Sequence, residues 1–159
     1  MGQKPRANYA TIEVTMNASI QIGFYAERPD EITLNIYLSG CRNNKKCDMR
    51  ACHNQLMRRF DYGTDIRLLY PRIERVLREG MVDSVVLLGG EPFDQDIKEL
   101  HSLVAYIQSI RPNISIHAYT GYEYDEVVGM ARLLGIESIC AGPYVNGIDT
   151  KRWYRVTPD

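Results

Sequence analysis

Three of the four cysteines in this chain fall within one polar segment, at Cys41, Cys47 and Cys52. An apolar run over 32–38, typical of a β-strand, leads into the segment. Thiolates are ligands of soft metals, so three of them on one loop favour a metal centre over a packed core. The Cys-x5-Cys-x4-Cys spacing lacks the second close pair of a structural zinc site. It fits an iron–sulfur cluster with one open iron, while three unrelated cysteines or a zinc loop remain alternatives.

Few other residues are candidates for a fourth ligand. Cys140 ends a distant predicted strand and is typical of a small buried hydrophobe. His53 directly follows Cys52, and adjacent residues rarely reach the same ion. His101, on a predicted helix, and His117, on a predicted strand, are interpreted as structural.

The composition is that of a globular protein with neither a basic nor a strongly apolar character. The 159 residues carry a net charge of −1 and are 45% hydrophobic, which offers no case for direct nucleic-acid or membrane binding. No apolar run approaches a membrane span, and the amino terminus lacks the apolar core of a signal peptide. We therefore expect a cytoplasmic protein, in which clustered thiols stay reduced and serve as ligands.

Hydrophobic periodicity predicts a single α/β domain over 1–159 with a mainly parallel sheet. Residues 1–7 are expected to be disordered, and 146–159 form a polar tail that Trp153 and Tyr154 anchor. A β-hairpin or two short strands precede the strand at 32–38. Further strands are predicted over 84–88, 114–119 and 136–141. The intervening helices are expected to begin near Pro71, at Asp94 or Asp96, and at Tyr124, and to end at Gly80, Pro112 and Gly135.

Glycine-rich turns follow the predicted strands, and parallel strands would bring them to one edge of the sheet. Gly89-Gly90-Glu91-Pro92 allows close backbone approach to a ligand, and the Glu91 carboxylate could hold an ammonium group. Tyr119-Thr120-Gly121-Tyr122 would suit a ribose or an adenine edge. Taken singly, each motif could equally be a tight turn with no ligand.

Together these motifs resemble the radical S-adenosylmethionine (SAM) superfamily, in particular the activating proteins of anaerobic ribonucleotide reductase. The matching residues are Ser39-Gly40-Cys41, Cys52-His53-Asn54, Leu88 to Pro92, Tyr119 to Tyr122 with Asp125-Glu126-Val127, and Gly142 to Val145. Cys-His-Asn is also similar to pyruvate formate-lyase activating enzyme. The resemblance implies a partial (β/α)6-type open barrel, here with an amino-terminal β-hairpin extension.

The resemblance also implies a cofactor set and a reaction. A 4Fe-4S cluster on Cys41, Cys47 and Cys52 would bind S-adenosyl-L-methionine through its fourth iron, and a flavodoxin-like donor would supply the electron. The SAM site would comprise Gly89, Gly90 and Glu91, which would receive the methionine amine, and Tyr119, Thr120 and Gly121, which would line the nucleoside. Ala51 and His53, which flank the last cysteine, would lie against SAM too. The resulting radical would take a hydrogen from a glycine of a large glycyl-radical enzyme, the anaerobic ribonucleotide reductase catalytic subunit.

The chain departs from the family in its cysteine loop and at both ends. The usual loop is Cys-x3-Cys-x2-Cys, so both spacers here are two residues longer. The amino-terminal Asn-Gly-Pro-Gly signature and the Gly-Ser-x-Asn-Gln type ending are absent. Two alternatives remain: a small radical SAM enzyme of modified-nucleobase synthesis, since Gly-Gly-Glu-Pro with a following Gln95 also occurs there, and a non-catalytic iron–sulfur or zinc module.

Overall fold

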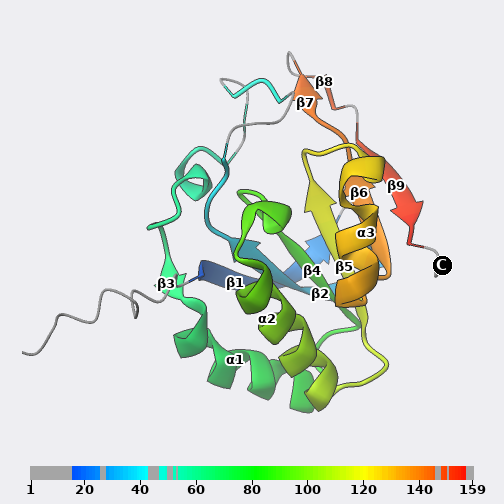
Figure 1. Cartoon of the computed structure of the whole chain (residues 1–159). Coiled ribbons are helices and arrows are strands. Elements are labelled where there is room, and N and C mark those ends of the chain that lie inside the picture. The colour runs from blue at the N-terminus through cyan, green and yellow to red at the C-terminus, as the bar shows by residue number, and fades with distance from the viewer. Residues whose placement is uncertain are drawn as a thin grey trace, which may run out of the picture.

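A computed structural model describes residues 16–25, 28–42, 47–49, 52, 54–145, 148–149 and 151–156. Within these residues the chain forms a seven-stranded sheet and three α-helices (Figure 1). The sheet contains β1 (Asn17–Tyr25), β2 (Arg28–Leu38), β3 (Thr64–Asp65), β4 (Ser84–Gly89), β5 (Ser115–Thr120), β6 (Ser138–Ala141) and β9 (Arg152–Arg155). The helices are α1 (Ile66–Arg78), α2 (Ile97–Ile110) and α3 (Tyr124–Leu134), with the short 3-10 helices η2 (Leu56–Arg58) and η3 (Pro92–Asp94). A separate strand pair comprises β7 (Tyr144–Val145) and β8 (Ile148–Asp149).

The sheet is mixed, with the strand order β3-β1-β2-β4-β5-β6-β9. The α/β prediction is confirmed, but the prediction of a mainly parallel sheet is wrong. Strands β2, β4, β5 and β6 are parallel, whereas β1, β3 and β9 pair antiparallel with their neighbours. The reason is that the amino-terminal hairpin extends one edge and the tail extends the other. The described strands form an open sheet with three crossover helices, so the six-unit partial barrel is not confirmed.

The four parallel strands end at the same edge of the sheet. Leu38 pairs with Gly89, and Thr120 pairs with Ala141, so the last residues of neighbouring strands are in register. The loops after β2, β4, β5 and β6 therefore leave from one edge. This confirms the predicted convergence of the cysteine segment and the glycine-rich turns.

Strand β4 is buried on both faces, as its continuous apolar run predicts. Val85 and Leu87 belong to the core that the sheet shares with the helices. Because side chains alternate along a strand, Val86 and Leu88 face the opposite side, and they are buried too. The helices lie in one layer in front of the sheet in Figure 1, with α2 contacting both α1 and α3.

Helix α1 begins at Ile66, five residues before the Pro71 that we predict in its first turn. Its N-cap is Asp65, whose carboxylate accepts a hydrogen bond from the Arg67 N–H at 3.0 Å. Pro71 therefore lies inside the helix, where its missing N–H costs one backbone hydrogen bond. The predicted cap of α2 at Asp96 and the end of α3 at Gly135 are confirmed.

The carboxyl-terminal tail adds a strand that the sequence analysis did not predict. β9 pairs antiparallel with β6. Trp153 packs edge-on against His117 and Tyr119, and Tyr154 stacks on Tyr124, so both predicted anchors are confirmed.

An amino-terminal hairpin is present, formed by β1 and β2. β2 begins at Arg28, four residues before the strand that we predict to start at residue 32. The expected hairpin or strand pair begins in residues 12–15, which lie outside the described residues. Residues 1–7 lie outside the described residues. In the described part of the chain, no helix has the length and apolar character needed to cross a membrane.

Candidate functional site

A cavity of about 480 Å³ opens at the carboxyl ends of the parallel strands, within the size range of ligand pockets. The cysteine segment, the turns after β4 and β5, and the tail all contribute to its wall. The lining residues are Cys41, Cys47, Asp48, Met49, Cys52, Asn54, Arg58, Leu88, Gly89, Gly90, Glu91, Tyr119, Thr120, Gly121, Tyr144 and Lys151. Nine of the eleven predicted site residues are among them. The other two, Ala51 and His53, lie outside the described residues.

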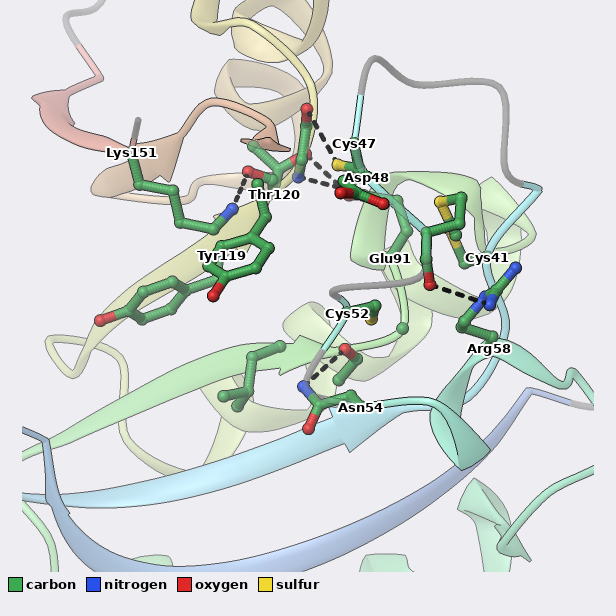
Figure 2. A pocket seen from close by; sticks show the side chains of 16 residues that line it. Cys41, Cys47, Asp48, Cys52, Asn54, Arg58, Glu91, Tyr119, Thr120 and Lys151 are labelled. Carbon is green, nitrogen blue, oxygen red and sulfur yellow. Dashed lines mark hydrogen bonds between the residues drawn. The ribbon is translucent and has the colours of Figure 1, made fainter. Parts of the chain in front are cut away.

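The three loop cysteines surround this cavity from separate positions (Figure 2). Cys41 is buried directly after β2, and its N–H donates to the Arg58 carbonyl at 3.1 Å. The Cys47 sulfur lies 3.9 Å from the Gly121 carbonyl oxygen, which connects the cysteine segment to the turn after β5. Cys140 is buried in β6 and is not a lining residue, in agreement with its predicted role as a hydrophobe.

The thiols share a cavity without forming a compact ligand set. Among the described residues, no three His, Cys, Asp or Glu side chains gather closely enough to hold a metal ion. The cysteine side chains would have to move inward to bind a common group. Their soft sulfur donors fit an iron–sulfur cluster chemically, and the lining cations Arg58 and Lys151 would offset its negative charge.

The two glycines after β4 allow close packing against the cysteine segment. A Cβ on Gly90 would lie 2.5 Å from the Gly40 carbonyl oxygen and closer still to that of Met57. A Cβ on Gly89, whose φ is +114°, would lie 2.7 Å from the backbone of Leu38. The backbone itself makes the contact, since the Glu91 N–H donates to the Gly40 carbonyl at 2.8 Å. The Gly-Gly pair therefore has a structural role within the chain in addition to lining the cavity.

Glu91 is turned into the protein, with a side chain that is 0% exposed. One carboxylate oxygen accepts from the Gly121 N–H at 2.8 Å. The other accepts from the Thr120 hydroxyl at 2.8 Å and from the Phe93 N–H at 3.1 Å. Hydrogen bonds to a carboxylate are strong, and a buried carboxylate requires them. Glu91 therefore ties the turn after β4 to the turn after β5, a role that the sequence analysis did not predict.

Asp94 makes a second buried link between the loops and does not cap α2. Its side chain is 3% exposed, accepts from the Arg42 N–H at 2.7 Å, and accepts from the Tyr122 hydroxyl. It thus joins the start of the cysteine segment to the turn after β5. The neighbouring Gln95 donates to the carbonyls of Gly40 and Glu91, at 3.3 and 3.0 Å.

Seven lining residues were not among the predicted site residues, and Lys151, Asn54 and Arg58 are three of them. Lys151 reaches back from the tail, and its ammonium donates to the Thr120 carbonyl at 2.6 Å (Figure 2). It also donates to the Gly142 carbonyl at 2.9 Å. Asn54 donates to the Gly89 carbonyl at 3.2 Å, and the side chain of Arg58 contacts the cysteine segment. The only sequence signals were the Cys-His-Asn motif for Asn54 and the nearby Trp153 anchor for Lys151.

Comparison with known proteins supports the cluster chemistry of this site. Residues 32–152 match the family described as a 4Fe-4S single cluster domain. The chain is also similar to the anaerobic ribonucleoside-triphosphate reductase-activating protein of Enterobacteria phage T4, with 23% identity over 122 residues. That alignment covers 76% of each chain. No solved structure matches.

Proposed function

We propose that this chain, which belongs to the 4Fe-4S single cluster domain family and is similar to an anaerobic ribonucleoside-triphosphate reductase-activating protein, is a radical SAM activase. It would cleave SAM reductively at a 4Fe-4S cluster and generate a glycyl radical on anaerobic ribonucleotide reductase. The observation that carries the proposal is the shared cavity of Cys41, Cys47 and Cys52 with the turns after β4 and β5.

The cysteines are the proposed cluster ligands, and the remaining walls are the proposed SAM site. The backbone of Gly89 and Gly90 lines the cavity and is suited to receive the methionine amine. Tyr119, held edge-on by Trp153 with ring centroids 5.2 Å apart, forms a rigid wall for the nucleoside together with Thr120 and Gly121. Lys151 is a lining cation suited to a carboxylate. Glu91 supports this site through Thr120 and Gly121 rather than through a direct charge.

A cluster held by Cys41, Cys47 and Cys52 would supply the electron for reductive cleavage of SAM at its sulfur–C5′ bond, with methionine as one product. The other product, a 5′-deoxyadenosyl radical, would take a hydrogen atom from the partner's glycine and leave 5′-deoxyadenosine and a glycyl radical. The cofactors supply this chemistry, while the chain binds, orients and shields them. The electron donor would be flavodoxin-like, the partner a large glycyl-radical enzyme, and the location cytoplasmic.

Binding of SAM to the anaerobically reconstituted protein tests the proposal directly. We expect calorimetry under argon to show one SAM site that depends on the cluster. No SAM binding despite an intact cluster would refute the activase and favour a non-catalytic iron–sulfur module.

The ligand assignment has its own test with a matched control. Replacing Cys41, Cys47 or Cys52 by Ala should abolish reductive SAM cleavage and reduce cluster absorbance. Cys140→Ala should leave both nearly intact, because Cys140 does not line the cavity. Loss of the cluster in Cys140→Ala with retention in Cys47→Ala would show that the ligands are assigned wrongly.

A further inference from the structure

The cysteine segment is long, with spacers of five and four residues between its thiols. A longer loop has more conformations to lose when its thiols converge on one group. The turn that directly follows it, from Gln55 through η2 to Arg58, is in position to reduce that loss. This turn contacts both arms of the segment.

The backbone of the turn holds the first cysteine. The Met57 carbonyl accepts from the Gly40 N–H at 2.7 Å, and the Arg58 carbonyl accepts from the Cys41 N–H at 3.1 Å. Gly90, the residue directly after β4, packs against the same Met57 carbonyl, so the turn is also held by the loop that follows β4. These bonds fix the arm of the segment that leaves β2.

The side chains of the turn hold the other arm, between the second and third cysteines. The Gln55 amide donates to the carbonyls of Met49 and Cys52, each at 2.9 Å. The Arg58 guanidinium donates to the Met49 carbonyl at 3.3 Å and to the Gln55 side-chain oxygen at 2.9 Å. Gln55 and Arg58 thus form one hydrogen-bonded unit that spans the Cys-x4-Cys spacer.

Arg58 also brings a positive charge to the cavity that the three thiols share. It is half-buried and lines this cavity together with Cys41, Cys47 and Cys52 (Figure 2). A nearby cation stabilises thiolates and the more negative, reduced state of a cluster. The next residue shows what an ordinary surface arginine does here. Arg59 pairs with Asp61 at 3.0 Å, with side chains 67% and 72% exposed.

We infer that Gln55 and Arg58 form a brace that holds the long cysteine segment in a cluster-ready conformation, and that the Arg58 charge raises the cluster's reduction potential. Arg58 is a positioning residue in this role, because it acts through the cysteine segment. The inference rests on the proposed cysteine ligands, but it is independent of SAM chemistry.

The brace can be tested first in the metal-free protein. Alkylation rates of Cys47 and Cys52, followed by mass spectrometry, should rise about three- to tenfold in Gln55→Ala and in Arg58→Lys, which keeps the charge; this is the factor expected for losing one or two hydrogen bonds. Arg59→Gln, the matched control, should alkylate like the unaltered protein. Rates in Gln55→Ala and Arg58→Lys that equal the rate in Arg59→Gln would overturn the brace.

The charge is tested in the reconstituted protein by redox titration followed by electron paramagnetic resonance. Arg58→Gln should shift the cluster midpoint to a more negative potential, whereas Arg58→Lys and Arg59→Gln should stay near the unaltered value. Arg58→Lys should still alkylate faster, because a lysine cannot make both hydrogen bonds of the guanidinium. An unchanged midpoint in Arg58→Gln would overturn the charge effect. If the unaltered protein formed no cluster, the ligand assignment would fail instead.

Discussion

Glu91→Gln separates two roles for the acid of the Gly-Gly-Glu-Pro turn: contact with a ligand amine, and a link between loops. The carboxylate accepts on both oxygens from Phe93, Thr120 and Gly121. A glutamine has one acceptor oxygen, so its amide NH₂ must face at least one of these donors. If the amide oxygen accepts from Thr120 and Phe93, the NH₂ group faces the Gly121 N–H, and two donors then oppose each other.

The loss of folding stability in Glu91→Gln follows from the burial of this side chain. A buried donor left without an acceptor costs about 1–3 kcal/mol, and weakening the remaining charge-assisted bonds adds to it. We expect Glu91→Gln to lower the free energy of unfolding by about 2–3 kcal/mol, or Tm by about 4–12 °C for a chain of this size. Glu79→Gln, which removes an exposed carboxylate paired with Arg75, should change the free energy of unfolding by less than about 0.5 kcal/mol.

Ligand binding then distinguishes the two roles. If Glu91 links the loops, Glu91→Gln should weaken SAM and 5′-methylthioadenosine by the same factor, because both use the wall formed by Tyr119 to Gly121. If Glu91 binds the amine, SAM alone should weaken, since 5′-methylthioadenosine has no amino group. Calorimetry with both ligands measures this. Unchanged stability together with a SAM-specific loss would refute the loop-linking role.

Three further predictions concern single residues. Gly90→Ala should destabilise the chain by more than about 3 kcal/mol in chemical denaturation, because the added Cβ would collide with backbone oxygens. Gly129→Ala is the control. A Cβ at this position in α3 would have no neighbouring atom within 4 Å, so the change should stabilise the chain by about 0.5–1 kcal/mol. Arg67 lowers the pKa of Asp65 through its side-chain hydrogen bond, so this pair stabilises the fold above the ordinary value of 3.8 and the contribution is lost as pH falls through the lowered pKa. Asp65→Asn should therefore destabilise the protein slightly at pH 7 and hardly at all in strong acid, and equal losses at both pH values would contradict the assignment. Lys151→Met should weaken SAM more than 5′-methylthioadenosine in calorimetry, and an equal effect on both would limit Lys151 to holding the tail.

The parts of the fold that depend on local sequence were predictable. The apolar run of β4, the Asp96 cap and the Gly135 stop each involve residues within one element or its ends, and each is confirmed. β9 was missed because Trp153 alone among its four residues is not exposed, so the strand shows little alternation. The partner of β1 could not be predicted, because periodicity does not say which alternating segments pair with one another.

The site was predictable as a set of loops but not as a set of side-chain directions. Parallel strands end at one edge, so the meeting of Cys41, Gly89 and Tyr119 follows from chain order. The inward turn of Glu91 does not, because its partners Thr120 and Gly121 lie about 30 residues away. Lys151 is 31 residues from Thr120, and only the pairing of β9 brings it there.

Several polar side chains around the cavity form hydrogen bonds that hold the loops together. Glu91, Asp94 and Gln95 bind backbone groups or hydroxyls of neighbouring turns, and the glycines pack against the cysteine segment. The proposed SAM site would then rely mainly on backbone groups, one aromatic wall and one lysine. Such a site depends on the accurate placement of its loops, because backbone groups cannot move independently to meet a ligand. Substitution of Glu91, Asp94 or Gln95 should therefore weaken the binding of the methionine and nucleoside parts of SAM alike. Substitution of Tyr119 should weaken mainly the nucleoside contact, and substitution of Lys151 mainly the carboxylate contact.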